Sequence, residues 1–127
     1  MLLSRALKPL SFYRSIATKM AKIEWAVTIF DKPGADRTAV RPRHVAAIPD
    51  AVNAGVFTAA GAIYKDVEKT QFAGSTFHMM AESKEEIAEI LKKDIYYEEG
   101  IWDIDSIVAY PAGIAVRIAK PMAGVKI

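Results

Sequence analysis

The sequence predicts one α+β domain of the ferredoxin-like βαββαβ type, with a four-stranded antiparallel sheet and two helices on one face. The order of the elements predicts this fold class, and chain length and cysteine content limit the alternatives. The chain has 127 residues, 52% hydrophobic and 25% charged, which fits a single domain. Four apolar runs of strand length alternate with two amphipathic segments. Cysteine is absent, so apolar burial must hold the fold together without disulfides or thiolate metal sites.

The first 22 residues differ in charge from the rest of the chain. They carry five Lys or Arg and no acid, so the net charge of +2 divides into +5 for residues 1–22 and −3 for residues 23–127. Their Ser-rich, amphipathic composition is typical of a mitochondrial transit peptide, which predicts a matrix location for the domain formed by residues 23–127. The alternative is a disordered basic tail or a surface helix, and initiation at Met20 would give a cytoplasmic form.

The first strand and the first helix are expected in the first third of the domain. Ile23–Phe30 is rich in β-branched and aromatic residues and ends at the turn signal Asp31–Gly34, which predicts a strand. Thr38–Ala54 has apolar residues at helical spacing and stops before Gly55. Pro49 lies inside this segment, and we expect it to kink or divide the helix.

The remaining elements follow from similar signals. Val56–Ile63 and Phe72–Ala81 predict two strands that a polar link joins as a hairpin. Ser83–Glu86 has the pattern of a capping box and opens a second helix, in a segment that Gly100 closes. Ile101–Tyr110 predicts the fourth strand. The apolar tail 114–119 predicts an additional edge strand.

Both faces of the predicted sheet carry apolar residues. In the first strand Trp25 and Val27 point to one face, while Ala26 and Phe30 point to the other. Because a solvated sheet face alternates to polar residues, we expect a second sheet to cover the face without helices, most simply in a two-fold homodimer. The alternative is a monomer whose C-terminal tail covers part of that face.

Two ionisable residues lie on the apolar stripes of the predicted helices. His44 lies one turn after Val40, and Asp94 lies seven residues after Ile87. If the helices pack side by side, the Asp94 carboxylate can approach the imidazole, fix its tautomer and raise its basicity, as a general base requires. The alternatives are that His44 is a core residue with satisfied hydrogen bonds and that Asp94 only caps the next loop or forms a salt bridge.

Three further residues are candidates for substrate binding. Arg41 lies one turn before His44, so both side chains reach the same region. Ser75 follows Gly74 in the third strand, and Gly61 lies in the second strand. A glycine in a strand lets a ligand approach the backbone, although it also marks a simple bulge.

The sequence argues against several other classes of protein. The His, Asp and Glu residues show no metal-ligand spacing, and no GxGxxG or GxxxxGK[ST] loop is present, so we expect neither a metal nor a nucleotide cofactor. No apolar run approaches the ~20 residues that span a bilayer. The negative domain gives no electrostatic footprint for nucleic acid. We expect His78 at the surface or in a dimer interface.

A series of short motifs resembles a known family. The motifs, in chain order, are Arg41-Pro42-Arg43-His44, Ala60-Gly61, Gly74-Ser75, Ser83 with Glu86, and Asp94-Ile95-Tyr96 with Gly100. Together, over residues 24–111, they resemble the YCII-like (YciI) proteins of the dimeric α+β barrel superfamily, which usually have Asp-Pro-Tyr in the last motif. The resemblance implies a ferredoxin-like protomer that dimerises through its sheet, with a His–Asp pair in a pocket between helices and sheet.

The resemblance also implies a chemistry. Similar proteins include a dehydrochlorinase acting on a chlorinated hydroxyhydroquinone and, in the wider superfamily, muconolactone isomerases. Carried over to this chain, His44 is the acid/base and Asp94 its orienting carboxylate, while Arg41 and Ser75 contact an anionic or hydroxylated substrate. We therefore expect a cofactor-independent isomerisation or elimination of a small cyclic or acidic metabolite. The alternative is a non-catalytic dimeric module that binds a small ligand or serves as an accessory subunit.

Overall fold

The computed structural model describes residues 21–120 and 122–126, so nearly all of the predicted leader lies outside the described residues. The predicted order of strands and helices is confirmed, with two short helical turns added between α4 and β4. The elements are β1 (Ile23–Phe30), α3 (Arg41–Asn53), β2 (Phe57–Tyr64), β3 (Phe72–Ala81), α4 (Lys84–Leu91), α5 (Ile95–Glu98), a 3-10 helix (Ile104–Ser106) and β4 (Val108–Pro111).

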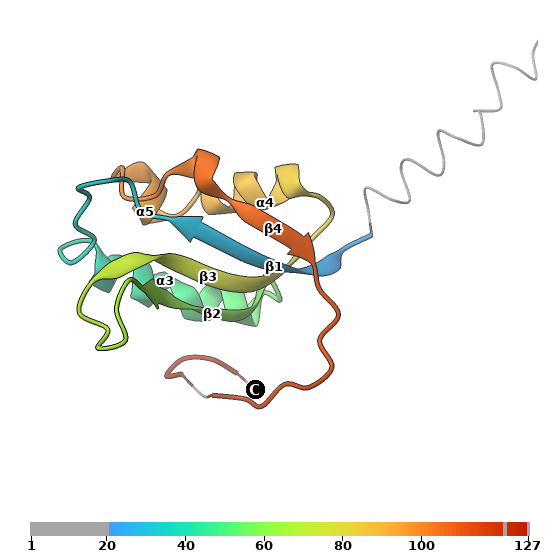
Figure 1. The fold of residues 1–127 in the computed structure, drawn as a ribbon. Helices are drawn as coiled ribbons and strands as arrows, with labels where there is room; N and C mark the ends of the chain where they lie inside the picture. The colour runs from blue at the N-terminus through green and yellow to red at the C-terminus, as the bar shows by residue number, and fades with distance from the viewer. Residues whose placement is uncertain (1–20, 121, 127) are drawn as a thin grey trace, which may run out of the picture.

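The four strands form one antiparallel sheet in the order β2-β3-β1-β4. The helices lie behind the sheet in Figure 1, and the face toward the viewer carries no helix of the described residues. This arrangement confirms the ferredoxin-like fold predicted from the sequence. β1 occupies a central position between β3 and β4, which explains why its alternate residues Trp25, Val27 and Ile29 are buried against the helices.

Helix α3 begins later than predicted and is not divided. The Asp36 carboxylate accepts a hydrogen bond from the Thr38 amide at 2.9 Å, which holds a turn before the helix. Pro49 lies inside α3, and the next turn continues with the Ala54 amide donating to the Asp50 carbonyl at 3.0 Å. Of the two expected effects of Pro49, division of the helix does not occur, because the chain continues as one helix from Arg41 to Asn53.

The fourth strand is shorter than predicted. Trp102 forms a single β-bridge with Asp31, and the chain then makes a 3-10 helix before β4 begins at Val108. The Asp103 side chain accepts from the Asp105 amide at 3.0 Å and caps this turn. Local hydrogen bonding by Asp and Ser side chains therefore replaces ladder pairing in the first half of the predicted strand.

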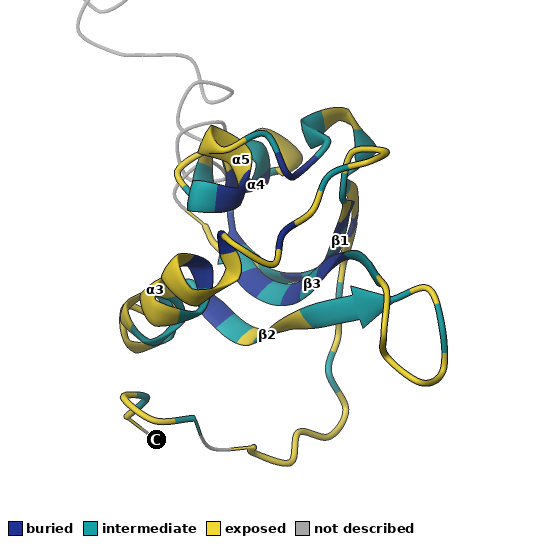
Figure 2. Ribbon diagram, turned by 90° about the vertical axis from the view of Figure 1, so that its left-hand side faces the viewer, coloured by how far each residue is buried: buried dark blue, intermediate teal, exposed yellow. Residues whose placement is uncertain are grey.

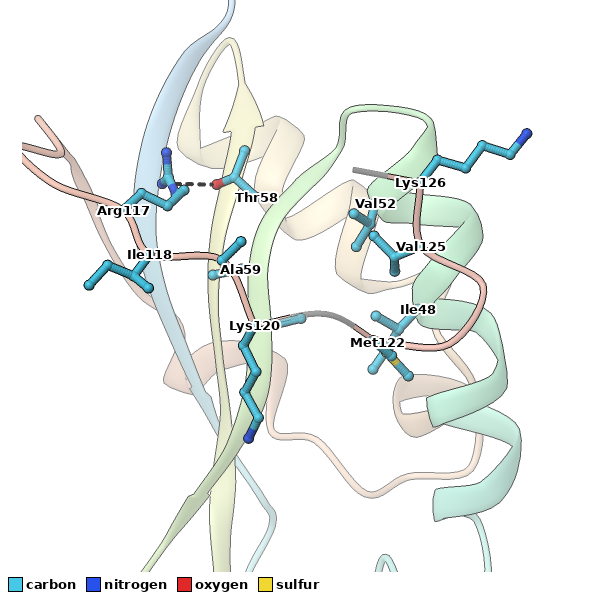
Figure 3. Close-up of a pocket in the computed structure, with 12 residues that line it drawn as sticks. Ile48, Val52, Thr58, Ala59, Arg117, Ile118, Lys120, Met122, Val125 and Lys126 are labelled. Atoms are coloured by element: carbon cyan, nitrogen blue, oxygen red, sulfur yellow. Dashed lines mark hydrogen bonds between the residues drawn. The ribbon is translucent and has the colours of Figure 1, made fainter.

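The C-terminal tail does not form the predicted edge strand. After Pro111 the chain leaves the sheet and crosses to α3, where the Asn53 side chain donates to the Gly124 carbonyl at 2.9 Å and accepts from the Lys126 amide at 2.8 Å. Figure 3 shows Met122 and Val125 of the tail facing Ile48 and Val52 of α3. Met122 and Val125 therefore pack against a helix, whereas Val116 and Ile118 of the predicted edge strand are exposed.

The core lies between the sheet and the helices. Its largest fully buried side chains include Phe77 and Met79 from β3, Ile87 and Leu91 from α4, and Trp102. Helix α3 contributes a single buried residue, His44, and its outer side is mostly exposed (Figure 2). An ionisable side chain thus occupies the position where α3 contacts the core, and such a group needs a polar partner.

The sheet face without helices is less apolar than predicted. Large apolar side chains are exposed there, notably Phe30, Val108 (47% exposed) and Tyr110 (67% exposed). Thr28 and His78 lie among them, since each occupies a β1 or β3 position between buried residues. The face is therefore a mixed surface, and His78 lies on it as expected.

Candidate active site

His44 and Asp94 meet between α3 and α5. The His44 Nδ1 atom lies 2.8 Å and 3.0 Å from the two carboxylate oxygens of Asp94, and the side chains are 8% and 14% exposed. An ionised carboxylate only accepts hydrogen bonds, so Nδ1 carries the proton and donates it. In the neutral ring Nε2 is then the basic atom, which is the tautomer a general base needs.

Asp94 also caps α5. Its Oδ1 atom accepts from the Tyr96 amide at 2.9 Å, and its backbone has the extended conformation of an N-cap residue. The alternative that Asp94 caps the following segment is therefore correct as well, and the two roles coexist. The cap fixes the carboxylate in position, and the carboxylate in turn fixes the imidazole.

Two aromatic rings hold the imidazole in place. Tyr96 stacks on the His44 ring, with centroids 3.9 Å apart and an angle of 17° between the planes. Trp102 meets the His44 ring edge-on, with ring centroids 5.7 Å apart. Among the described residues no hydrogen bond reaches Nε2 of His44, so this atom has no protein partner there.

A buried ion pair that the sequence did not reveal lies beside these rings. Arg37 is 2% exposed and donates two hydrogen bonds to Asp31, at 2.9 Å and 2.6 Å. Its guanidinium lies 4.5 Å from the centroid of Tyr96 and 5.0 Å from that of Phe72. Both charged residues come from the loop after β1, where no periodic pattern marks them. The one sequence signal for this ion pair is that Asp31 and Arg37 are opposite charges six residues apart in the same loop.

Ser75 lies inside this network and not at an open surface. Its hydroxyl accepts from Arg37 Nη2 at 3.1 Å and from Trp102 Nε1 at 3.2 Å, and the residue is buried. Both acceptor positions of the Ser75 oxygen are occupied, and the residue is 1% exposed, so the structure places this predicted binding residue in the core. The hydroxyl instead ties the Arg37 loop to Trp102.

The two strand glycines do not open the site to a ligand. A Cβ on Gly74 would lie 2.1 Å from the Ile29 carbonyl oxygen, so this glycine permits the close approach of β3 and β1. Gly61 is exposed and pairs with Thr76, on the sheet face opposite the helices. The structure therefore does not bring Gly61 together with His44 and Asp94.

Arg41 lies on the same side of the sheet as the His44–Asp94 pair. It is the first residue of α3, is exposed, and has its guanidinium 5.6 Å from the Phe72 ring centroid. No carboxylate partner of Arg41 occurs among the described residues. Arg41 is thus an exposed cation on the same helix as His44.

Two cavities adjoin α3. One, of about 420 Å³, lies between α3 and the segment 90–98 and is lined by Ala47, Ile90 and Asp94 among others. The other, of about 600 Å³, lies under the C-terminal tail and is lined by residues of α3, β2 and the tail, mostly apolar but including Arg117, Lys120 and Lys126 (Figure 3). Neither His44 nor Asp94 lines the larger cavity, so the smaller one is nearer to the candidate chemistry.

In the part of the chain that the structure describes, no group of three or more His, Cys, Asp or Glu side chains could hold a metal ion. Over the same residues no helix is both long and apolar enough to cross a membrane.

One protein-family model matches this chain. The model of the YCII-related domain matches residues 23–110, which is most of the described structure. The chain belongs to the YCII-related family.

One solved structure has the same fold. It is 5-chloro-2-hydroxyhydroquinone dehydrochlorinase (TftG) from Burkholderia phenoliruptrix AC1100, in complex with 2,5-dihydroxybenzoquinone. The similarity covers 72% of this chain and 94% of that one, with a TM-score of 0.56 and 17% sequence identity. At 17% identity, this likeness supports the fold of the chain and nothing more.

Curated relatives match shorter pieces. Fusaric acid biosynthesis protein 2 of Gibberella fujikuroi is 45% identical over 38 residues, which are 30% of this chain and 36% of the relative. Aspartate kinase FUB3 of Fusarium oxysporum f. sp. lycopersici is 45% identical over 42 residues, which are 33% of this chain and 8% of the relative. The matched segments therefore span a minor part of either relative.

Proposed function

We propose that this YCII-family protein is a cofactor-independent enzyme that moves a proton on a small cyclic or acidic metabolite. His44 is the acid/base, and Asp94 orients it. The observation that carries the proposal is the hydrogen bond of 2.8 Å from His44 Nδ1 to Asp94, together with the absence of a partner at Nε2 among the described residues. A base with one fixed nitrogen and one unpartnered nitrogen can take a proton from one atom of a bound substrate and return it to another.

The surroundings of the pair suit an isomerisation or an elimination. In both reactions a C–H bond is broken and negative charge develops on the substrate. Arg41, one turn from His44, supplies a positive charge that no carboxylate of the described residues pairs. The names of the relatives point in the same direction. TftG is a dehydrochlorinase, and two relatives are named for fusaric acid biosynthesis, so small-molecule processing occurs among proteins similar to this one.

The proposal includes an assembly and a location. The exposed Phe30, Val108 and Tyr110 favour a homodimer that packs the open sheet faces together. The acid-free leader of residues 1–22 favours the mitochondrial matrix. Imaging of a C-terminal fluorescent fusion tests the location, and import of the form that starts at Met20 would contradict it.

A specific observation also favours the second candidate, a non-catalytic module that binds a small ligand. His44 is largely buried, and the cavity of about 420 Å³ is lined by Asp94, by apolar side chains and by three further charged residues, without the imidazole. A ligand held there would contact the carboxylate side of the pair and would exchange no proton with Nε2.

One experiment separates the two candidates. The full chain and its His44→Gln and His78→Gln variants are screened for thermal stabilisation by a library of cyclic and acidic metabolites, because a ligand that binds the native state raises the melting temperature. Each hit is then incubated in D2O and followed by NMR for exchange of carbon-bound protons. We expect exchange with the parent and with His78→Gln, and none with His44→Gln. Stabilisation without exchange in all three proteins would support the binding module.

A further inference from the structure

The Tyr96 hydroxyl is a buried polar group that no described residue satisfies. The residue is 0% exposed, and its oxygen is the one buried side-chain polar atom among the described residues that makes no hydrogen bond. Native proteins pair nearly all such groups, and an exception requires an explanation, such as a bound water, an ion or a ligand. The position of Tyr96 in the molecule decides among these explanations.

Tyr96 lies between the His44–Asp94 pair and two cations. Its ring stacks on His44 at 3.9 Å, and the Arg37 guanidinium lies over the same ring at 4.5 Å from the centroid. Arg37 and Arg41 both lie over the Phe72 ring, at 5.0 Å and 5.6 Å. The phenol therefore belongs to the part of the molecule where a substrate of His44 would lie.

The charges around the phenol favour an anionic partner. Asp31 already neutralises Arg37 through two hydrogen bonds, whereas Arg41 has no carboxylate partner among the described residues. The Asp94 carboxylate also acts on the phenol, so the formal charges nearby balance, and Arg41 is the cation among them that no carboxylate of the described residues binds. Arg41 is exposed, so this cation lies on the solvent side of the group.

Tyr96 is suited to donate a hydrogen bond and not to accept a proton. Burial raises the pKa of the phenol, and the positive charges of Arg37 and Arg41 oppose this effect only in part. The group therefore stays protonated at neutral pH. A protonated phenol in a site closed to bulk water is an effective donor to an oxygen that carries negative charge.

We propose that the Tyr96 hydroxyl binds an anionic oxygen of the ligand, and that the ligand class is therefore a phenolate or an enolisable carbonyl compound. This inference rests on the proposed function for its catalytic meaning. His44 Nε2 takes a proton from the carbon next to the carbonyl group. The C–H electron pair forms a C=C bond, and the carbonyl π pair moves onto oxygen, where Tyr96 donates its hydrogen bond and Arg41 lies nearby. The imidazolium then returns the proton to a second carbon, or a leaving group departs with its electron pair.

The test compares two neighbouring tyrosines. Tyr96→Phe keeps the ring that stacks on His44 and removes only the hydroxyl, while Tyr97→Phe makes the same change at a residue that is 37% exposed. The probe is 4-nitrophenol, whose anion and neutral form have different absorbance, and 4-nitroanisole is the matched compound without an ionisable oxygen. Titration of the full chain gives the affinity for each compound and the pKa of the bound phenol.

The parent chain is expected to bind nitrophenolate more tightly than nitroanisole and to lower the pKa of the bound phenol. In Tyr96→Phe the affinity for nitrophenolate falls about tenfold or more, the size expected for a lost hydrogen bond to a charged oxygen, while the affinity for nitroanisole is unchanged. Tyr97→Phe behaves as the parent does. The unfolding midpoint of Tyr96→Phe stays equal or rises, because the variant removes an unpaired buried group.

Three results overturn the inference. Equal affinity of the parent and Tyr96→Phe for nitrophenolate would show that the Tyr96 hydroxyl does not bind the anion. A lower unfolding midpoint in Tyr96→Phe with unchanged binding indicates that a buried water satisfies the hydroxyl. Failure of the parent chain to prefer the anion over nitroanisole excludes an oxyanion site. The proposed function fails separately, when no carbonyl compound exchanges protons through His44 although Tyr96→Phe still weakens nitrophenolate binding.

Discussion

Asp94 accepts a hydrogen bond from the His44 ring and another from the Tyr96 amide, so one carboxylate joins the imidazole to the first turn of α5. The segment that carries Asp94 also carries the aromatic ring that stacks on His44. The orientation of the imidazole therefore depends on the short helix as well as on the carboxylate. Changes at residue 94 can separate the two roles, because asparagine and aspartate cap helices about equally well.

Asp94→Asn is expected to lower the rate of His44-dependent proton exchange by about 10²- to 10⁴-fold, the usual contribution of a positioned general base. The free energy of unfolding should change by about 1 kcal/mol or less, because the cap is retained. Proton-exchange rates by NMR and urea unfolding check the two parts. Asp94→Ala is the comparison, since it also loses the cap and should be less stable. A full rate in Asp94→Asn would remove the carboxylate from the mechanism.

The buried pair of Arg37 and Asp31 predicts a large effect on stability. Arg37→Met leaves the Asp31 carboxylate, 8% exposed, without its partner, and should cost about 3–5 kcal/mol in urea unfolding. Arg43→Met is the matched control, because the Arg43–Glu99 pair is well exposed at 3.5 Å and should contribute at most about 1 kcal/mol. Adding Asp31→Leu to Arg37→Met should recover part of the loss. Equal costs for the two arginine variants would contradict the assignment.

Much of the fold follows from periodicity and local signals. The bounds of β1 and β3 agree with the runs Ile23–Phe30 and Phe72–Ala81, because each run has strand composition and a turn signal beside it. The Ser83 cap is present, with the hydroxyl accepting from the Glu86 amide at 3.1 Å. The Glu86 carboxylate, however, accepts from the Glu82 amide, one residue before the cap. Such local patterns are readable because few residues decide them.

The candidate site is only partly readable for the opposite reason. His44 and Asp94 stand out because they interrupt apolar stripes. Arg37 lies in a loop without periodicity, and its burial depends on Asp31, Phe72 and Tyr96, which reach it from three separate segments. The burial of Ser75 follows from that same packing. Contacts that form only in the tertiary structure produce no regular spacing in the sequence. The sequence therefore predicts substrate binding for Ser75, whose hydroxyl in fact joins Arg37 to Trp102.

Gly74 and Gly61 are expected to respond differently to alanine. Gly74→Ala places a Cβ 2.1 Å from the Ile29 carbonyl and should force β3 away from β1, at a cost of about 3 kcal/mol or more. Gly61→Ala meets nothing within 4 Å and should leave stability equal or raise it by about 0.4–1 kcal/mol. Urea unfolding measures both. Unchanged ligand binding by Gly61→Ala would also agree with the position of Gly61 on the sheet face opposite His44 and Asp94. A loss of ligand binding would indicate that Gly61 is a binding residue after all.

The cap of α4 predicts a loss of stability in acid. The hydrogen bond from Lys22, assisted by the Glu82 amide, lowers the pKa of Glu86 below its usual 4.5. A carboxylate with a depressed pKa in the folded state stabilises the protein above its unfolded-state pKa, and this contribution disappears as the pH falls through the folded-state pKa. The parent should therefore exceed Glu86→Gln in unfolding midpoint at neutral pH, and the difference should shrink below about pH 4.5. A difference independent of pH would show that charge at Glu86 contributes nothing.

The exposed apolar residues of the open sheet face predict how the protein assembles. Val108 and Tyr110 are exposed, and their β1 neighbours in the pairing of β1 with β4 are Thr28 and Ala26. If two copies pack these faces together, Tyr110→Glu places a charge in the interface and should shift sedimentation from dimer to monomer. Val67→Glu is the matched control, because Val67 is exposed in the loop between β2 and β3 and lies outside that face. A dimer that persists in Tyr110→Glu, or a parent chain that sediments as a monomer, would place the open face in solvent.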